Sequence, residues 1–457
     1  MQYSRNIYQL PDNDIFIAKQ QILSEDSNII NTGIISLRNL IDKVRDSNLN
    51  SYTMDLIDEK VYAQLVTIVC SPMFKIPIKQ KVLELIADMC KIKSYSKSIR
   101  EFWSLGLHIH LLQILQDKNS PFSLTPIITI LSKIAKWTRV SRDSLLENNY
   151  LSILLANLSF RSNSITDQYS ILDGINRLIR IKKFDLPNYV YTIIEALSQF
   201  LFSLDSIDET IGKAYDILNF SIDSMQSLNI PFDIDLVPLL KKSFEILEGT
   251  HQNSIVTPII SFFCNCIFHN DEIAKLLIQN GVLDALHGIL SNEPSEELII
   301  ICLKTCANCA CISVELNSQI SQSDFAADAY DLLNIGSLKV KIEALLFFQY
   351  LLTPKADFFD QDNAKVIMDR FPDIFNTFAD LLLLDQEIKV LSLGCLQSFY
   401  YSIIICKEAE QPSPPLQALL QQDVFEQLGL LQESENADIR FLAQKLIEIG
   451  TEFSKEN

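Results

Sequence analysis

The chain has 457 residues, of which 48% are apolar, while Gly (11) and Pro (15) are both scarce. This composition suits helices and disfavours an all-β fold. The formal net charge of −19 repels nucleic acid and anionic membranes, and it either favours basic partners or simply keeps a large solenoid soluble. No apolar run is long enough for a signal peptide or for a span of about 18 residues, so we expect an intracellular, reduced protein.

A sequence motif that predicts two helices joined by a tight corner recurs along the chain. It reads LIDEKVYAQLVTIV at 56–69, LLENNYLSILLANL at 145–158, LLIQNGVLDALHGIL at 276–290 and ISQSDFAADAYDLL at 320–333. In each copy a hydrophobic pair ends a short helix, a corner residue follows, and a second amphipathic helix begins. Nine such corners recur roughly 45 residues apart: Lys60, Gly106, Asn149, Asn188, Asp235, Gly281, Asp324, Asp373 and Asp423.

This period predicts an all-α armadillo or HEAT solenoid, here an armadillo-repeat right-handed superhelix of about nine to ten three-helix repeats. After the copy at 276–290, a polar turn SNEPSE (291–296) precedes a longer third helix, ELIIICLKTCANCACI (297–312). Corner Gly and Asn residues fit a left-handed backbone that ends a helix. Corner Asp residues fit an N-cap.

The repeats have recognisable ends. Residues 1–23 form a short N-terminal extension with Arg5 and Lys19 as its only basic residues, and 24–44 predict an unpaired third helix that caps the solenoid. The solenoid covers 24–453. The prolines of EAEQPSPP (408–415) predict a loop. A final helix at 436–450 caps the other end, and 454–457 form a frayed tail.

Three segments carry a resemblance to a known family. They read SRDSLLENNYLSILLANL (141–158), RIKKFDLPNYVYTIIEALSQFLFSLD (180–205) and LQALLQQDVFEQLGLLQESENADIRFLAQKLIEIGTEF (416–453). In this order, and over about residues 24–453, the chain resembles importin alpha. The resemblance implies a nuclear transport adaptor that holds a basic nuclear-localisation peptide of a cargo protein in its concave groove. It also implies a monomer that needs no cofactor and is found in the cytoplasm and the nucleus.

In that family, Trp and Asn residues four apart recur on the third helices: Asn amides grip an extended peptide backbone, and Trp rings hold Lys or Arg stems. When the Trp and Asn pair is mapped onto the third helices of this chain, no mapped position holds Trp. The two tryptophans, Trp103 and Trp137, lie at other positions. The mapped pairs are Glu84 and Asp88, Thr129 and Lys133, Asp173 and Arg177, Tyr215 and Asn219, Ser261 and Asn265, Lys304 and Asn308, and Leu345 and Gln349.

The mapping yields a predicted peptide-binding set. Lys133 and Arg177 place positive charge where a basic peptide would lie, so the predicted contacts are elsewhere. They are Tyr215, Asn219, Asn265, Asn308 and Gln349, with Glu84 and Asp88 facing a basic partner. The alternative interpretation is that all seven are solvated polar residues of a helix face.

The family also has a basic N-terminal arm that binds importin beta, whereas residues 1–23 hold two basic residues. Three readings stay open: this protein lacks that step, it uses another carrier, or the arm lies outside this chain. The alternative function is an armadillo scaffold or adaptor for protein–protein interaction without a transport role.

Other constellations predict no chemistry. Six cysteines cluster at 264, 266, 302, 306, 309 and 311, but Cys302, Cys306 and Cys309 share one helix face, which predicts buried packing rather than a metal site. His108 and His110 would lie on different sides of a helix, so they form no ligand pair. The chain has no P-loop, dinucleotide or nucleophile-elbow motif, and we expect no enzyme.

Overall fold

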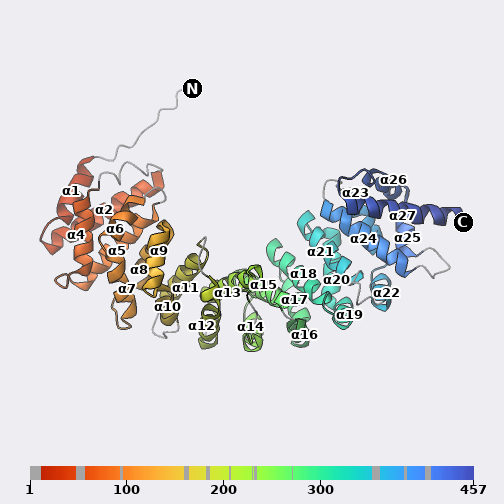
Figure 1. Ribbon diagram of the computed structural model, residues 1–457, viewed down its shortest axis with the longest axis horizontal. Coiled ribbons are helices and arrows are strands. Elements are labelled where there is room, and N and C mark those ends of the chain that lie inside the picture. Colours follow the sequence, from red (N-terminus) through yellow and green to blue (C-terminus); the bar gives the residue numbers. More distant parts are fainter. Residues whose placement is uncertain are drawn as a thin grey trace, which may run out of the picture. The chain divides into compact units, whose positions relative to one another are not determined.

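The computed structural model describes residues 12–47, 57–92, 96–158, 164–181, 186–204, 207–228, 230, 234–269, 271–352, 361–384, 389–406 and 413–456. Every regular element in these ranges is a helix, and none is a strand. The predicted all-α class is therefore confirmed. The chain divides into two compact units, residues 1–221 and 222–457, and helix α13 (Glu209–Ser227) runs across the division (Figure 1).

In the first unit, short first, second and longer third helices alternate as predicted. The first helices are α6 (Ser96–Ser104) and α9 (Arg139–Glu147), with the 3₁₀ turn η1 (Leu186–Asn188) in that place in the next repeat. The second helices are α4 (Glu59–Cys70), α7 (Leu107–Gln116), α10 (Tyr150–Leu158) and α12 (Val190–Ser203). The third helices are α2 (Ser27–Ser47), α5 (Ile76–Lys91), α8 (Leu124–Trp137) and α11 (Ile165–Ile179).

The second unit repeats the same order. Its first helices are α16 (Asp271–Gln279), α19 (Val314–Gln322), α22 (Gln361–Arg370) and α25 (Pro414–Leu419). Its second helices are α14 (Val237–Gly249), α17 (Val282–Leu290), α20 (Asp324–Ile335), α23 (Ile374–Leu384) and α26 (Gln422–Leu431). Its third helices are α15 (Asn253–His269), α18 (Glu296–Ala310), α21 (Leu338–Leu352), α24 (Lys389–Ile405) and α27 (Ala437–Glu456).

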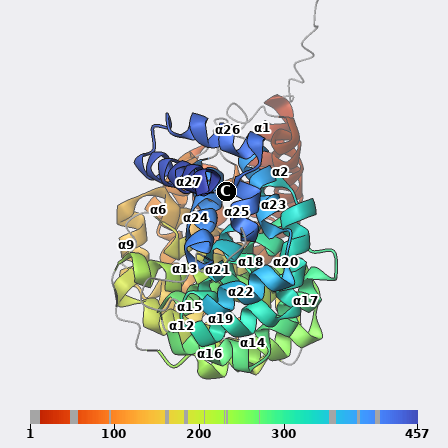
Figure 2. The ribbon, with the colours of Figure 1, turned by 90° about the vertical axis from the view of Figure 1, so that its right-hand side faces the viewer.

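Equivalent helices of successive repeats pack against one another. Third helices pack in the series α15, α18, α21, α24 and α27, second helices pack as α17 on α20, and first helices pack as α19 on α22 (Figures 1 and 2). Each repeat therefore buries its apolar face against the next one, which is how a helical solenoid builds a continuous core.

Five of the six clustered cysteines lie in that core, as predicted, and Cys311 is half-buried. Cys302, Cys306 and Cys309 on α18 are buried, and so are Cys264 and Cys266 on α15, which packs on α18. Burial raises the pKa of these thiols, so they are neutral packing groups. Within the described residues, no three Cys, His, Asp or Glu side chains are grouped to hold a metal ion.

Three of the nine corners adopt the left-handed backbone predicted for them. Gly106 has φ 73°, Gly281 has φ 81° and Asn149 has φ 60°. Lys60 is wrong as a corner because it lies inside α4, whose N-cap is Asp58, with a side chain that accepts a hydrogen bond from the Val61 amide. The carboxylate of Asp58 can accept a hydrogen bond from an unpaired amide of the first helical turn, whereas a Lys side chain has no acceptor to offer it.

Two Asp corners are also shifted by a residue or two. Asp324 and Asp423 lie in the first turns of α20 and α26, whose N-caps are Ser323 and Gln421. A carboxylate in the first turn is still stabilised by the positive end of the helix dipole, which explains why Asp is found there. Asp235 behaves closer to the prediction, since its Oδ1 accepts from the Val237 amide at 3.0 Å where α14 begins.

The ends of the helical stack differ from the predictions in detail. The helix predicted to stand unpaired is α2, and α1 (Asp12–Ile22) packs against it from within the predicted extension. At the other end, α27 continues to Glu456. Pro414 and Pro415, predicted as loop, open α25, because proline needs no amide partner in a first helical turn. The rest of that predicted loop, 408–412, lies outside the described residues.

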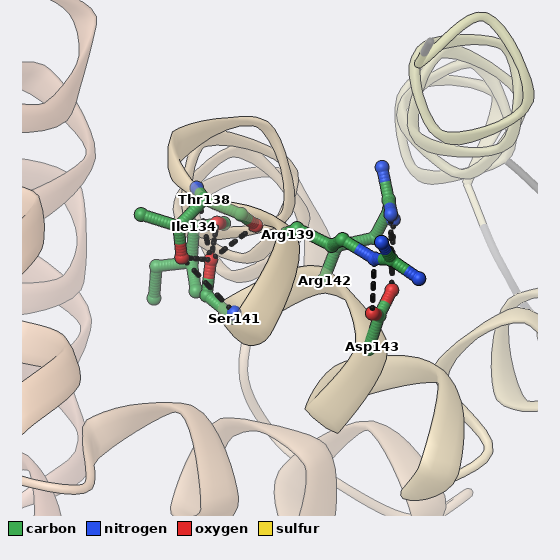
Figure 3. Close-up of polar contacts among 6 residues, drawn as sticks. All are labelled: Ile134, Thr138, Arg139, Ser141, Arg142 and Asp143. Carbon is green, nitrogen blue, oxygen red and sulfur yellow. Dashed lines mark hydrogen bonds and ion pairs between the residues drawn. The ribbon is translucent and has the colours of Figure 1, made fainter. Parts of the chain in front are cut away.

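The junction between α8 and α9 shows how a third helix is ended. Thr138 and Ser141 form a capping box, in which each side chain accepts a hydrogen bond from the other's backbone amide (Figure 3). The Ser141 hydroxyl also donates to the Ile134 carbonyl of α8 at 2.7 Å. On the next turn Asp143 accepts from both Arg139 and Arg142. These contacts hold the C-terminal end of α8 in a defined place.

A matched pair of glycine variants tests the corner geometry. Gly281→Ala is expected to lower the free energy of unfolding by about 1–2 kcal/mol, because alanine is strained at a positive φ. Gly288→Ala, in the body of α17 with open space around its Cβ position, is expected to raise it by about 0.5–1 kcal/mol. Urea unfolding followed by circular dichroism measures both. Shifts of the same sign in the two variants would contradict this assignment.

No single helix among the described residues is long and apolar enough to cross a membrane. Only α16 and α17 taken together meet that length and hydropathy, and they are bent by 69°. Their residues Leu277, Val282 and Leu286 are fully buried in the repeat core.

Candidate functional site

The stacked third helices of each unit form one continuous row, which we call the third-helix ladder. In the first unit it consists of α2, α5, α8 and α11, and in the second of α15, α18, α21, α24 and α27, each packed on the next. The sequence-predicted site residues lie on these helices and on α13. The ladder therefore presents the helix faces on which a site was predicted.

Glu84 and Asp88 are already paired inside the protein. Arg38 of α2 contacts Glu84 Oε2 through Nη1 at 2.7 Å and Asp88 Oδ2 through Nε at 3.1 Å. Lys91 Nζ lies 3.1 Å from the other Asp88 oxygen. The Asp88 side chain is only 9% exposed. Two cations of the chain thus occupy the carboxylates that were predicted to face a basic partner.

The remaining predicted residues of the first unit differ in exposure. Tyr215 on α13 is fully buried, and Asn219, one turn later, is half-buried. A ligand could reach the Tyr215 ring only if the helix packing opened. Tyr215 thus occupies a core position, while Asn219 lies at the boundary between core and solvent.

In the second unit, predicted amides contact the neighbouring ladder helix. Asn308 Nδ2 donates to Cys264 Sγ at 3.3 Å, from α18 to α15, and Gln349 Nε2 of α21 donates to Gln397 Oε1 of α24. Asn265 is half-buried on α15. Asn308 and Gln349 therefore link successive repeats, and their role in ligand binding stays a prediction.

The first unit contains a cavity of about 480 Å³ on its ladder, which we call the ladder cavity. It lies between α8 and α11 and reaches the start of α13. Its lining residues are Thr125, Ile128, Thr129, Ser132, Ile165, Thr166, Tyr169, Ser170, Asp173, Arg177, Asp208 and Glu209. A volume of this size can hold one or two side chains of a bound segment.

Short side chains and one glycine explain why the cavity forms there. Gly174 lets α11 approach α8 closely, since a Cβ at that position would lie 2.7 Å from Ile128 Cγ2. Near this contact, the residues of α8 and α11 that face each other are Thr and Ser. Thr125 of α8 and Ser170 of α11 form a hydrogen bond of 2.7 Å between the two helices. Short polar side chains on both walls leave a space that larger residues would fill.

Charged and aromatic groups give the ladder cavity a defined polarity. Asp173 pairs with Arg177 at 2.6 Å, one turn along α11, and with Lys213 of α13 at 3.6 Å. The Lys213 ammonium also lies 6.0 Å from the centre of the Tyr169 ring, within cation–π range. The Tyr169 side chain is 40% exposed, so the cavity offers one accessible aromatic surface beside an ion-pair network.

Sequence reasoning reached only part of this cavity. It mapped Thr129, Asp173 and Arg177 to the ladder but left them out of the predicted contacts, because Lys133 and Arg177 place positive charge where a basic peptide would lie. It did not single out Ser132, Tyr169 or Ser170. Their spacing from the mapped residues, three or four positions along the same helix, is the signal that could have added them.

No family model matches the chain, and no curated protein matches it. Solved structures do match its fold. One is an engineered protein, with a TM-score of 0.69 and 14% identity over 95% of this chain and 98% of the other. Another comes from a study of a phosphorylation switch that controls the interaction between cadherin and beta-catenin, with a TM-score of 0.59 and 14% identity over 96% and 91%. The chain has an armadillo-type helical-repeat fold.

Proposed function

We propose that this protein is a non-enzymatic adaptor that binds an extended segment of a partner protein on the third-helix ladder of its first unit. The observation that supports this most is the ladder cavity, which coincides with the mapped positions Thr129, Asp173 and Arg177. Its Thr and Ser hydroxyls can pair with a peptide backbone, and the exposed Tyr169 edge can pack against an apolar side chain. The fold similarity to a structure from a study of cadherin and beta-catenin agrees with protein binding.

Nuclear transport is the second candidate function, favoured by the resemblance of segments 141–158, 180–205 and 416–453 to importin alpha. A basic cargo peptide and a receptor such as importin beta would then be its partners. That function needs carboxylates that accept Lys or Arg side chains from outside. Arg38 and Lys91 already occupy Glu84 and Asp88, so we rank the scaffold above the transport adaptor.

A peptide selection tests the proposed site. The full chain is presented to a phage-displayed library of random linear peptides, and recovered clones are retested on Thr129→Trp, in which the indole fills the ladder cavity. The matched control is Thr192→Trp on the exposed face of α12. We expect clones that bind the unchanged chain and the control but lose about tenfold or more in affinity on Thr129→Trp. Circular dichroism checks that both variants fold.

Clones that bind all three proteins equally would place the binding surface elsewhere and contradict the proposed site. A selection that yields no clone dependent on Thr129 after repeated rounds would contradict the adaptor function of this cavity altogether.

A further inference from the structure

Positive charge gathers where the ladder cavity meets the C-terminal ends of its helices. Lys91 ends α5, Lys136 lies in the last turn of α8 with Lys133 one turn earlier, and Arg177 lies in the last turn of α11. Because α5 packs on α8 and α8 on α11, these residues come from three successive rungs of the ladder. We call Lys91, Lys133, Lys136 and Arg177 the basic cluster.

The members of the basic cluster act on one another electrostatically. Partial burial lowers the pKa of Lys133, and the charges of Arg177, Lys136 and Lys91 lower it further. The packing of α5 on α8 and of α8 on α11 brings these cations into one region of the ladder, where like charges repel one another. In a chain of net charge −19, a concentrated positive region on the face that carries the cavity is an exception to the surrounding charge.

The carboxylates nearby do not neutralise this cluster. Asp88 is shared between Lys91 and Arg38, and Asp173 is shared between Arg177 and Lys213. In the described parts of the chain, Lys133 and Lys136 have neither an ion pair nor a side-chain hydrogen bond. Lys133 is half-buried and Lys136 is exposed, and a carboxylate added beside them would form charge-assisted hydrogen bonds and offset the mutual repulsion.

Helix dipoles account for only part of the arrangement. A cation in the last turn of a helix is stabilised by the negative helix end, which suits Lys91, Lys136 and Arg177 taken singly. It does not account for Lys133, which lies deeper in α8 with cations on both neighbouring rungs. Lys133 is therefore the residue that most needs an external anion.

We propose that the segment bound at the ladder cavity is acidic, with Asp or Glu carboxylates that pair with Lys133 and Lys136. This inference rests on the proposed function, since it names the chemical class of the segment at that same site. Asp208 and Glu209 also line the cavity, so the carboxylates of the segment lie against α8 and not inside the cavity. A few acidic residues suit so local a patch, whereas the overall negative charge repels a polyanion such as nucleic acid.

The cavity-dependent peptides from the selection test this inference. We expect them to contain about three times as many Asp and Glu residues as Lys and Arg residues, gathered toward one end. For a fluorescein-labelled selected peptide, Lys133→Glu with Lys136→Glu is expected to weaken binding by about tenfold or more in fluorescence anisotropy. The matched charge change, Lys241→Glu with Lys275→Glu on α14 and α16, is expected to leave the affinity unchanged.

The outcomes separate the inference from the function on which it rests. Cavity-dependent peptides without acidic bias, or with equal affinity for the Lys133 and Lys136 variant, would overturn the acidic ligand and leave the adaptor function standing. A single-stranded DNA oligonucleotide that binds as tightly as the peptides would also overturn it. Absence of any cavity-dependent peptide would overturn both proposals.

Discussion

Replacing Phe348 by alanine is expected to lower the free energy of unfolding by about 3–5 kcal/mol, the largest loss among the variants considered. Phe348 on α21 is fully buried. Its ring meets those of Phe347, Tyr330 and Phe371 edge-on, with centroid distances of 5.2, 6.3 and 5.6 Å. Truncation removes the buried ring and leaves a cavity where the second helix α20, the third helix α21 and the next repeat meet.

Urea unfolding monitored by circular dichroism measures this loss, with Phe441→Ala as the matched control. Phe441 lies on α27 with 56% of its surface exposed, so its truncation is expected to cost less than about 1 kcal/mol. Similar losses for the two phenylalanines would mean that the aromatic cluster around Phe348 is not the core of these repeats.

Replacing Arg38 by methionine is expected to lower the free energy of unfolding by about 1–3 kcal/mol. The substitution keeps an aliphatic stem on α2 but leaves the 9% exposed Asp88 with Lys91 alone and Glu84 with Gln80. The estimate stays below that for a fully buried pair, because the Arg38 side chain is 40% exposed and solvent screens its charge.

Arg139→Met is the matched control, measured in the same way. Arg139 is 74% exposed and pairs with Asp143, which also keeps Arg142 as a partner, so its loss is expected to change stability by less than about 1 kcal/mol. The Arg38 variant also tests the transport reading. If removing the Arg38 charge creates binding to a Lys-rich peptide that the unchanged chain lacks, Arg38 is what keeps basic ligands off α5.

The repeat was predictable because its signals are local. Gly106, Asn149 and Gly281 mark left-handed corners through their own backbone preferences, and the spacing of Cys302, Cys306 and Cys309 indicates one buried helix face. Lys60 misled the register because the residue that caps α4, Asp58, lies two positions earlier. Corner residues locate each repeat well, but they locate the first residue of a helix less precisely. Ser, Asp and Gln can each stand just before a helix or in its first turn.

The candidate site was less predictable because it depends on contacts between distant residues. The ladder cavity requires Gly174 to approach Ile128 and the Thr and Ser residues of two helices to face each other. No single window of the sequence shows that coincidence. The pairing of Arg38 with Glu84 likewise joins residues 46 positions apart in the chain. Tyr215 was mapped by counting along its helix, and counting alone does not show that its side chain is buried.

Charge explains why the mapped pattern and our proposal name different ligands. The mapping assumed a basic peptide, in keeping with the overall negative charge. The structure neutralises the acidic pair on α5 with Arg38 and leaves Lys133 and Lys136 without partners in the described residues. Under the proposed function, local charge on the ladder, and not net charge, decides which segment binds there.

Hydrogen–deuterium exchange of the full chain, alone and saturated with a cavity-dependent peptide, tests the central claim most directly. We predict slower exchange in α8 and α11, which line the cavity, and little change in α16 and α17 of the second unit. Protection confined to the second unit, or no protection in α8 and α11 at saturating peptide, would contradict the assignment of this ladder as the binding surface.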